Sequence, residues 1–197
     1  MQLNILERLF ILSPIRAFLQ DRLEVRQLIK LGGITPGAKV LEVGCGPGFG
    51  IDLLYRRFKV CCVDAFDLDE RMISLVRRQQ KRSNFSPSLW VGNVRNIPIE
   101  SSHYDAIFNF GAIHHVVDWR ASLREIHRVL KPGGKFYCEE IMRWYITHPI
   151  IGRLMDHPQE DRFDEVQFIE ALRKTGFRIN ASRQLANLYL WVVATKD

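Results

Sequence analysis

The stretch from Val40 to Gly48 carries the clearest chemical signal in the sequence. It reads VLEVGCGPG, an apolar run that contains one carboxylate, Glu42, and leads into a turn with three glycines. Glycine lets the chain turn tightly and lets a ligand lie against the backbone, because no Cβ is in the way. We therefore expect a ligand to bind at this turn.

The spacing of the glycines limits the kind of ligand. A dinucleotide fingerprint GxGxxG that begins at Gly44 needs glycine at position 49, where the sequence has Phe49, and no other frame satisfies it. A nicotinamide-dependent oxidoreductase is therefore disfavoured. The carboxylate of Glu42 suits a ligand with an ammonium or sulfonium group better than it suits a pyrophosphate, and this favours S-adenosylmethionine.

The segment from Glu42 to Gly48 resembles the first motif of the class I S-adenosylmethionine-dependent methyltransferases, in particular the type 11-like methyltransferase domain. Later segments continue the resemblance in order, over roughly residues 31–139. The resemblance implies that the chain is an enzyme, that its cofactor is S-adenosylmethionine and that its product is S-adenosylhomocysteine. The later matching segments are 67–72, 92–98, 104–115 and 130–135.

The resemblance also assigns roles to residues. In this family an acidic residue at the end of the second strand binds the ribose hydroxyls. Asp64 and Asp67 are both candidates, and the run DLDERM favours Asp67. Asn93 stands where the family usually has an aspartate that accepts the adenine amino proton. The residues expected to bind the cofactor are Glu42, Gly44, Cys45, Gly46, Gly48, Asp67, Leu68, Met72, Asn93, Val94, Asn109 and Gly111.

Methyl transfer is an in-line displacement, so alignment and a water-free pocket supply most of the acceleration and a catalytic base is optional. His115 is the candidate catalytic residue, because imidazole titrates near neutral pH and the loop after the fourth strand is expected to face the reacting groups. The alternative is that His114 and His115 are both structural, one under the strand and one bonded to the loop.

These residues need a fold that brings strand ends together. Apolar runs alternate with helical patterns from Val40 onward, which is typical of βα units, and the last two runs are joined by about four residues, which permits only an antiparallel hairpin. We predict an α/β fold: a doubly wound, Rossmann-like, seven-stranded and mostly parallel sheet with one antiparallel strand near the C-terminus and helices on both faces. The predicted strands are 39–43, 60–66, 88–91, 104–111, 135–139, 177–183 and 188–195, and the helices include 51–58, 119–130 and 164–175.

The length of 197 residues predicts a single methyltransferase domain. Within it we expect an N-terminal helical cap (1–31), the cofactor-binding core (32–139), a substrate-cap segment (140–163), and a final helix with a strand hairpin (164–197). The N-terminal segment is expected to dock on its own domain, with contact to a membrane surface as the alternative.

Composition restricts the remaining possibilities. The four cysteines form no CxxC pair, so we expect neither a disulfide framework nor a bound metal, and no apolar run is long enough to span a membrane. The net charge of +6 is dispersed, which makes nucleic acid an improbable partner. We expect a cytoplasmic enzyme with a small-molecule or lipid-like acceptor. The alternatives are an RNA or protein acceptor, or a protein that binds S-adenosylmethionine without catalysis.

Overall fold

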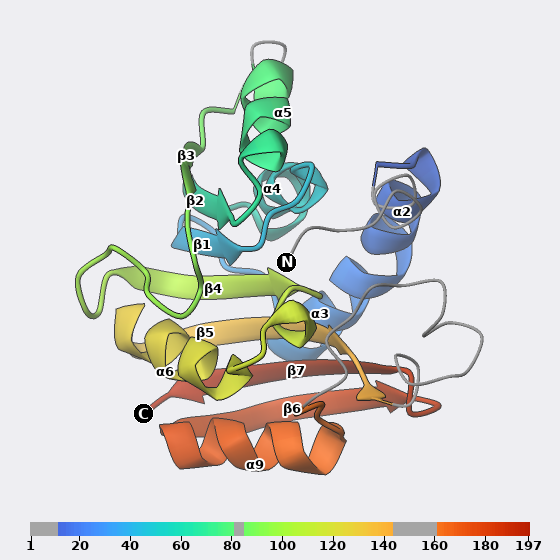
Figure 1. Ribbon diagram of the computed structural model, residues 1–197, viewed down its shortest axis with the longest axis vertical. Helices are drawn as coiled ribbons and strands as arrows, with labels where there is room; N and C mark the ends of the chain where they lie inside the picture. Colours follow the sequence, from blue (N-terminus) through green and yellow to red (C-terminus); the bar gives the residue numbers. More distant parts are fainter. Residues whose placement is uncertain (1–11, 81–84, 144–160) are drawn as a thin grey trace.

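The computed structural model describes residues 12–80, 85–143 and 161–197, and their strands form one seven-stranded sheet in the order β3-β2-β1-β4-β5-β7-β6 (Figure 1). Neighbouring strands are parallel except at β7, which runs antiparallel to both β5 and β6. The predicted fold class is confirmed. The strands are β1 (Lys39–Val43), β2 (Cys62–Asp67), β3 (Ser88–Val91), β4 (Tyr104–Phe110), β5 (Leu130–Ile141), β6 (Phe177–Leu185) and β7 (Tyr189–Lys196).

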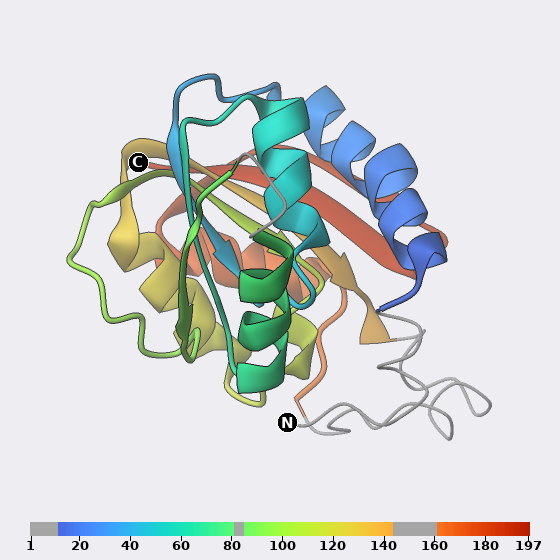
Figure 2. The ribbon, with the colours of Figure 1, turned by 90° about the horizontal axis from the view of Figure 1, so that it is seen from above.

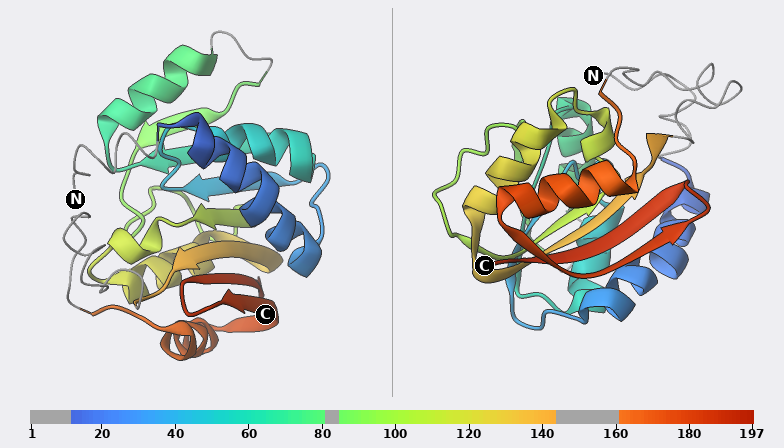
Figure 3. Two further views of the ribbon diagram at one scale, coloured as in Figure 1. Left: turned by 90° about the vertical axis from the view of Figure 1, so that its right-hand side faces the viewer. Right: turned by 90° about the horizontal axis from the view of Figure 1, so that it is seen from below.

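Helices cover both faces of this sheet. Figure 2 shows blue α3 (Val25–Gly32) and cyan α4 (Phe49–Leu53) on one side, with yellow α6 (Trp119–Val129) on the other. The view from below in Figure 3 places orange α9 (Glu165–Thr175) beside α6. The helix α5 (Glu70–Gln80) packs with α4 in the core of the first face. Both faces of the parallel strands are therefore buried, as a doubly wound sheet requires.

The first face is covered by a helix that changes its pitch. After the N-cap Ser13, α2 (Pro14–Leu19) continues through a π-helical turn, η1 (Gln20–Glu24), into α3. Val25 and Leu28 are fully buried against this face of the sheet. A π-helical turn rotates the side chains that follow it relative to an α-helix, and such turns are frequent at functional sites. The part of the predicted N-terminal cap before residue 12 lies outside the described residues.

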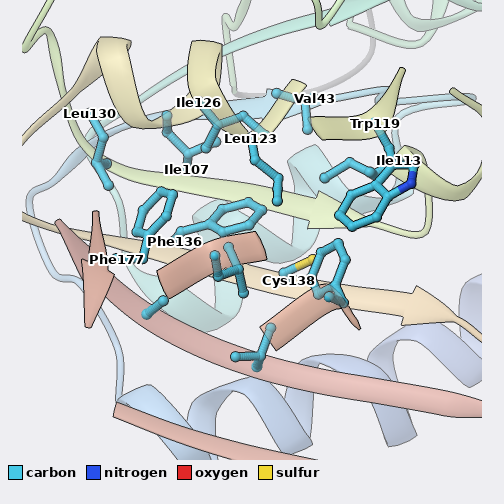
Figure 4. Packing of buried hydrophobic residues seen from close by; sticks show 14 of the residues in the cluster. Val43, Ile107, Ile113, Trp119, Leu123, Ile126, Leu130, Phe136, Cys138 and Phe177 are labelled. Atoms are coloured by element: carbon cyan, nitrogen blue, oxygen red, sulfur yellow. The ribbon is translucent and has the colours of Figure 1, made fainter. Parts of the chain in front are cut away.

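The second face has its own core, in which α6 and α9 bury apolar side chains on β4 and β5 (Figure 4). Trp119, Leu123 and Ile126 from α6 have at most 1% exposure. The helix α9 begins at a capping box, in which the Asp164 side chain accepts from the Gln167 backbone and the Gln167 side chain accepts from the Asp164 backbone. This face is therefore closed by hydrophobic packing and a well-capped helix.

Several boundaries differ from the sequence prediction. The predicted helix 51–58 begins at Phe49 and is π-helical over Leu54–Phe58, and the largest shift is at the start of β5. The helix α6 ends at Val129, and β5 begins at Leu130, because Leu130 has extended backbone angles and pairs with Tyr104 before the register shifts. The turn of Pro132 and two glycines therefore lies inside a long irregular strand. In the predicted substrate cap, residues 144–160 lie outside the described part of the chain.

Candidate functional site

A cavity of about 280 Å³ lies where β1, β2, β4 and β5 end. Its walls come from the glycine turn after β1, the turn after β2 and the loop after β4, and the helix α2 closes it from the side toward which β1 and β4 point (Figure 1). Parallel strands of an open α/β sheet present their carboxyl ends at one edge, which is where such folds bind ligands. The topology therefore brings separate sequence motifs to one site.

The glycine turn is held close to the neighbouring loop. Gly44 has a φ of +66°, and a Cβ at this position would overlap the side chain of Ala112 in the loop after β4. The Cys45 amide donates to the carbonyl oxygen of Phe66 at the end of β2 (3.0 Å). The turn thus forms a narrow floor between two strand ends, with backbone exposed to the cavity.

Asp67 connects this turn to the end of β2. Its carboxylate accepts hydrogen bonds from the Gly46 amide (2.8 Å) and the Asp69 amide (2.8 Å), and the residue lines the cavity. Burial raises its pKa, and the two backbone hydrogen bonds lower it. Each carboxylate oxygen has a second lone pair. Asp67 can therefore hold the turn and still accept from two ligand hydroxyls.

Glu42 has an unsatisfied carboxylate oxygen at the back of the cavity. The residue is 2% exposed, and its Oε2 atom has no hydrogen-bond partner among the described residues. A Cβ at Gly50 would overlap its Oε1 atom, so glycine at that position makes room for the carboxylate. Burial and the charge of Asp67 raise the pKa of Glu42 well above its ordinary value. A positively charged ligand group next to this oxygen would offset both the cost of burying the charge and the repulsion from Asp67. S-adenosylmethionine has such a group.

The turns after β2 and β3 form an apolar wall. Leu68 is 56% exposed at the cavity, whereas Met72 is buried behind it. Val94 and Asn93 also line the cavity, but the Asn93 side-chain oxygen accepts from the Arg95 amide (3.0 Å) in a local turn. Leu68 therefore offers an apolar surface for a flat ring, and the Asn93 oxygen already has one donor.

Three of the candidate positions lie outside the cavity lining. Gly48 caps α4 at a φ of +89°, and a Cβ there would meet Val76 at 2.9 Å. Asn109 is fully buried beneath the loop after β4. Asp64, the alternative to Asp67, lies within β2 and accepts from the Tyr104 hydroxyl (2.9 Å). Gly48 and Asn109 therefore support residues of the lining from behind, Asp64 has no part in it, and the remaining predicted cofactor residues line the cavity.

Both histidines line the cavity, but they differ in what holds them. The His114 Nδ1 atom lies 2.6 Å from Oε2 of Glu140, and both side chains are buried. Glu140 also accepts from the Ile113 amide (2.8 Å), the His114 amide (3.2 Å) and the Asn109 amide group (2.6 Å). Burial raises the pKa of Glu140 to about 7 despite these bonds. The His115 ring packs against the His114 ring, with centroids 4.1 Å apart and the planes tilted by 39°.

Nothing in the sequence marks three further charged residues of the cavity wall. Arg16 and Glu24 come from the N-terminal helix, and Glu139 from the end of β5. Arg16 Nη1 lies 2.6 Å from Glu24 Oε1. For Glu139 alone there is an indirect signal. Two acidic residues, at positions 139 and 140, end an apolar run that is expected to be a buried strand, so their side chains are expected to be buried as well.

Comparisons with known proteins agree with this geometry. A family model described as a methyltransferase domain, type 11, matches residues 41–138. A fatty-acid O-methyltransferase of Mycolicibacterium smegmatis is 36% identical over 101 residues, which are 51% of this chain and 36% of that protein. A demethylmenaquinone methyltransferase of Staphylococcus aureus is 25% identical over 200 residues, which cover 94% of this chain and 80% of that protein.

The chain spans only 36% to 56% of the length of the relatives that match it most strongly. Over the whole fold it resembles the crystal structure of a SAM-dependent methyltransferase from Aquifex aeolicus, with a TM-score of 0.79, 20% identity and 100% coverage of both chains. At that identity the likeness concerns the fold alone. Within the described residues, no helix is long and apolar enough to cross a membrane.

Proposed function

The chain belongs to the class I S-adenosylmethionine-dependent methyltransferases, and we propose that it transfers the methyl group of that cofactor to a small-molecule or lipid-like acceptor. The observation that carries the proposal is the buried Oε2 atom of Glu42, which lacks a donor among the described residues and lies beside the glycine turn. Only a ligand with a cationic or hydrogen-bond-donating group satisfies it.

The protein's part in the reaction is binding and alignment. Asp67 would accept hydrogen bonds from the ribose hydroxyls, Leu68 would lie against the adenine, and Glu42 would accept from the ammonium group. When bound, the cofactor supplies a methyl group on a positively charged sulfur. The cavity is lined mainly by apolar side chains and backbone, so few waters remain to compete with the acceptor. Proximity and exclusion of water supply the acceleration.

The loop after β4 is the part of the wall expected to face the acceptor. We retain His115 as the candidate that contacts it, since His115 lines the cavity. His114 is the better oriented of the two rings, because Glu140 fixes its Nδ1 atom. Replacing each histidine by asparagine separates them: loss of turnover with unchanged cofactor affinity identifies the ring that acts on the acceptor.

The acceptor class rests on two arguments. Apolar side chains from the N-terminal helix and from β5 and β7 surround the part of the cavity beyond the glycine turn, among them Leu19, Ile141 and Tyr189. A relative that aligns over most of this chain is named a demethylmenaquinone methyltransferase. Both favour a small molecule with an apolar body over an RNA or a protein.

The first experiment is calorimetric titration with S-adenosylmethionine and S-adenosylhomocysteine. We expect micromolar binding of both, and Asp67→Ala should weaken it by about 30-fold or more, because hydrogen bonds to a charged group are lost together with the latch on the glycine turn. Asp64→Asn is the matched control and should bind normally, since Asp64 lies outside the lining. Binding of NADH instead would overturn the proposal.

Transfer of a labelled methyl group then tests the acceptor. Cell extract is fractionated into organic-soluble molecules, RNA and protein after incubation with the enzyme and methyl-labelled S-adenosylmethionine. Label in the organic-soluble fraction supports the proposal, whereas label in RNA or protein supports the rival acceptor. Cofactor binding without transfer to any fraction would indicate a binding protein that does not catalyse.

A further inference from the structure

The alternation of β5 sends two adjacent carboxylates to opposite faces of the sheet. Glu139 pairs with Phe110 and Trp191, which belong to the core under the N-terminal helix, whereas Glu140 follows Cys138 into the core under α6. Glu42 on β1 pairs with Phe108 and so lies on the same face as Glu139, two strands away. One cavity therefore contains two separated acidic positions.

Glu139 meets a second carboxylate, Glu24, from the π-helical turn η1. Glu139 is 2% exposed and Glu24 is 8% exposed, and both line the cavity. The Oε2 atom of each lacks a donor within the described residues. Burial, together with the charge and hydrogen bond of Glu24, raises the pKa of Glu139 well above its ordinary value. Two buried carboxylates that face each other need either a shared proton or a ligand that donates to both.

Arg16 does not satisfy this pair. Its Nη1 atom donates to Oε1 of Glu24 at 2.6 Å, which leaves the Oε2 atoms of both glutamates without it. No other cation lines the cavity in the part of the chain that the structure describes. Arg16 therefore fixes the position of Glu24 on the helix and leaves the pair open toward the cavity.

The balance of charge in the cavity selects the ligand. Its described wall contains five carboxylates and one guanidinium. S-adenosylmethionine carries a net charge of about one positive unit, so the wall keeps a net negative charge after the cofactor binds, even when Glu24 and Glu139 share one proton. A carboxylate acceptor would be repelled, a hydroxyl would gain little, and an ammonium would be attracted and could donate to both Oε2 atoms.

We propose that Glu24 and Glu139 form the acceptor subsite and that the methyl acceptor is an amine. This inference rests on the proposed methyl transfer and adds the chemical class of its acceptor. The apolar body of the amine lies along Leu19, Ile141 and Tyr189, and its nitrogen lies between the two carboxylates.

The carboxylate pair can also accept the proton that the ammonium must lose before its nitrogen attacks the methyl group. A bound ammonium loses one proton to a carboxylate of the pair, and the nitrogen lone pair then forms the new N–C bond as the C–S bond breaks with its electrons left on sulfur. The products are the methylated ammonium and neutral S-adenosylhomocysteine, so atoms and charge balance. A buried carboxyl group whose pKa lies above its ordinary value accepts such a proton readily.

The test uses three probes of equal length: octylamine, octanol and octanoate, each titrated into the full-length protein saturated with S-adenosylhomocysteine. We expect octylamine to bind at least about tenfold more tightly than the other two, because only an ammonium is attracted by the buried pair. The heat should depend on the ionisation enthalpy of the buffer, since the bound ammonium displaces the proton held by the carboxylates.

Glu139→Gln and Glu24→Gln should each weaken octylamine binding by about tenfold or more. Glu170→Gln, an exposed position on α9 that pairs with Lys174, is the matched control and should not change it. S-adenosylhomocysteine should bind all four proteins alike, which separates this inference from the proposed function.

Four results would overturn the amine assignment. Octanol or octanoate that binds as tightly as octylamine, or no binding of any of the three, contradicts the charge argument. Octylamine binding that survives Glu139→Gln places the amine elsewhere. Loss of S-adenosylhomocysteine affinity in Glu139→Gln assigns the pair to the cofactor.

Discussion

Glu139 and Glu140 are neighbours in the chain and equally buried, but their surroundings are opposite. Four donors converge on Glu140, from Asn109, the amides of Ile113 and His114, and the His114 ring. Glu139 faces Glu24, and its Oε2 atom has no donor from the described chain. The strand places one carboxylate in the scaffold and the other in the cavity wall.

The difference separates two uses of a buried charge. A carboxylate whose oxygens are satisfied by the protein positions what bonds to it, here the loop after β4. A carboxylate without a protein donor costs stability in the unliganded state and is retained when a ligand completes it. Unsatisfied buried groups therefore point to ligand positions more directly than charge alone.

The largest expected effect is on stability, and it separates the substitution of Glu140 by glutamine from the same substitution at Glu139. Glu140→Gln turns an acceptor into an amide that opposes donors from Ile113, His114 and Asn109, so we expect a loss of about 3 kcal/mol in the free energy of unfolding. Glu139→Gln removes an unsatisfied charge and should change stability by less than about 1 kcal/mol, or increase it. Urea unfolding followed by tryptophan fluorescence at neutral pH measures both. Equal losses would contradict the comparison.

The pH dependence of stability should be of intermediate size. Burial and Glu24 raise the pKa of Glu139. Glu140 raises it further, and Arg16 opposes the shift. Burial raises the pKa of Glu140 to about 7. A carboxyl whose pKa is raised on folding stabilises the protein when protonated, so stability falls as pH rises above the ordinary value of 4.5 toward and beyond 7. Glu139 should contribute part of this fall, because its pKa is raised on folding.

Unfolding curves of the wild type and Glu139→Gln between pH 5 and pH 8 isolate this contribution. The variant should lose less stability over the range, because glutamine does not titrate. The other titrating groups remain in both proteins, so the difference between the two curves reports Glu139. Identical slopes would show that Glu139 does not change its protonation on folding.

The smallest effect is expected far from the cavity. Asp164→Ala removes the N-cap of α9 and should cost about 1 kcal/mol. Affinity for S-adenosylhomocysteine should not change, because α9 packs on the second face and Asp164 does not line the cavity. A changed affinity would mean that the two faces of the sheet are energetically coupled.

Local sequence was enough to predict the fold class, and most of the residues proposed to bind the cofactor line one cavity in the structure. The alternation of apolar runs predicted the sheet, and the short connection before β7 predicted the reversed strand. The motifs around Gly44 and Asp67 could be read because strand and turn lie within a few residues of each other, so the backbone itself sets their geometry. The start of β5 at Leu130 was missed, because pairing with Tyr104 overrides the local turn signal.

The carboxylate pair could not be read in this way. Glu24 and Glu139 are 115 positions apart in the chain, and a helix with a π-helical turn brings them together across the end of β5. Likewise the choice between His114 and His115 depends on Glu140, whose direction is set by the register of β5 with β4.

The sequence by itself thus determined the succession of strands and helices, the reversed strand, the glycine turn and the acidic residue at the end of β2, because each depends on short-range patterns of glycine, apolar and acidic residues. Only the tertiary structure decided which buried charges are satisfied. Satisfaction depends on the donors that distant segments bring within about 3 Å, and no local pattern encodes that distance.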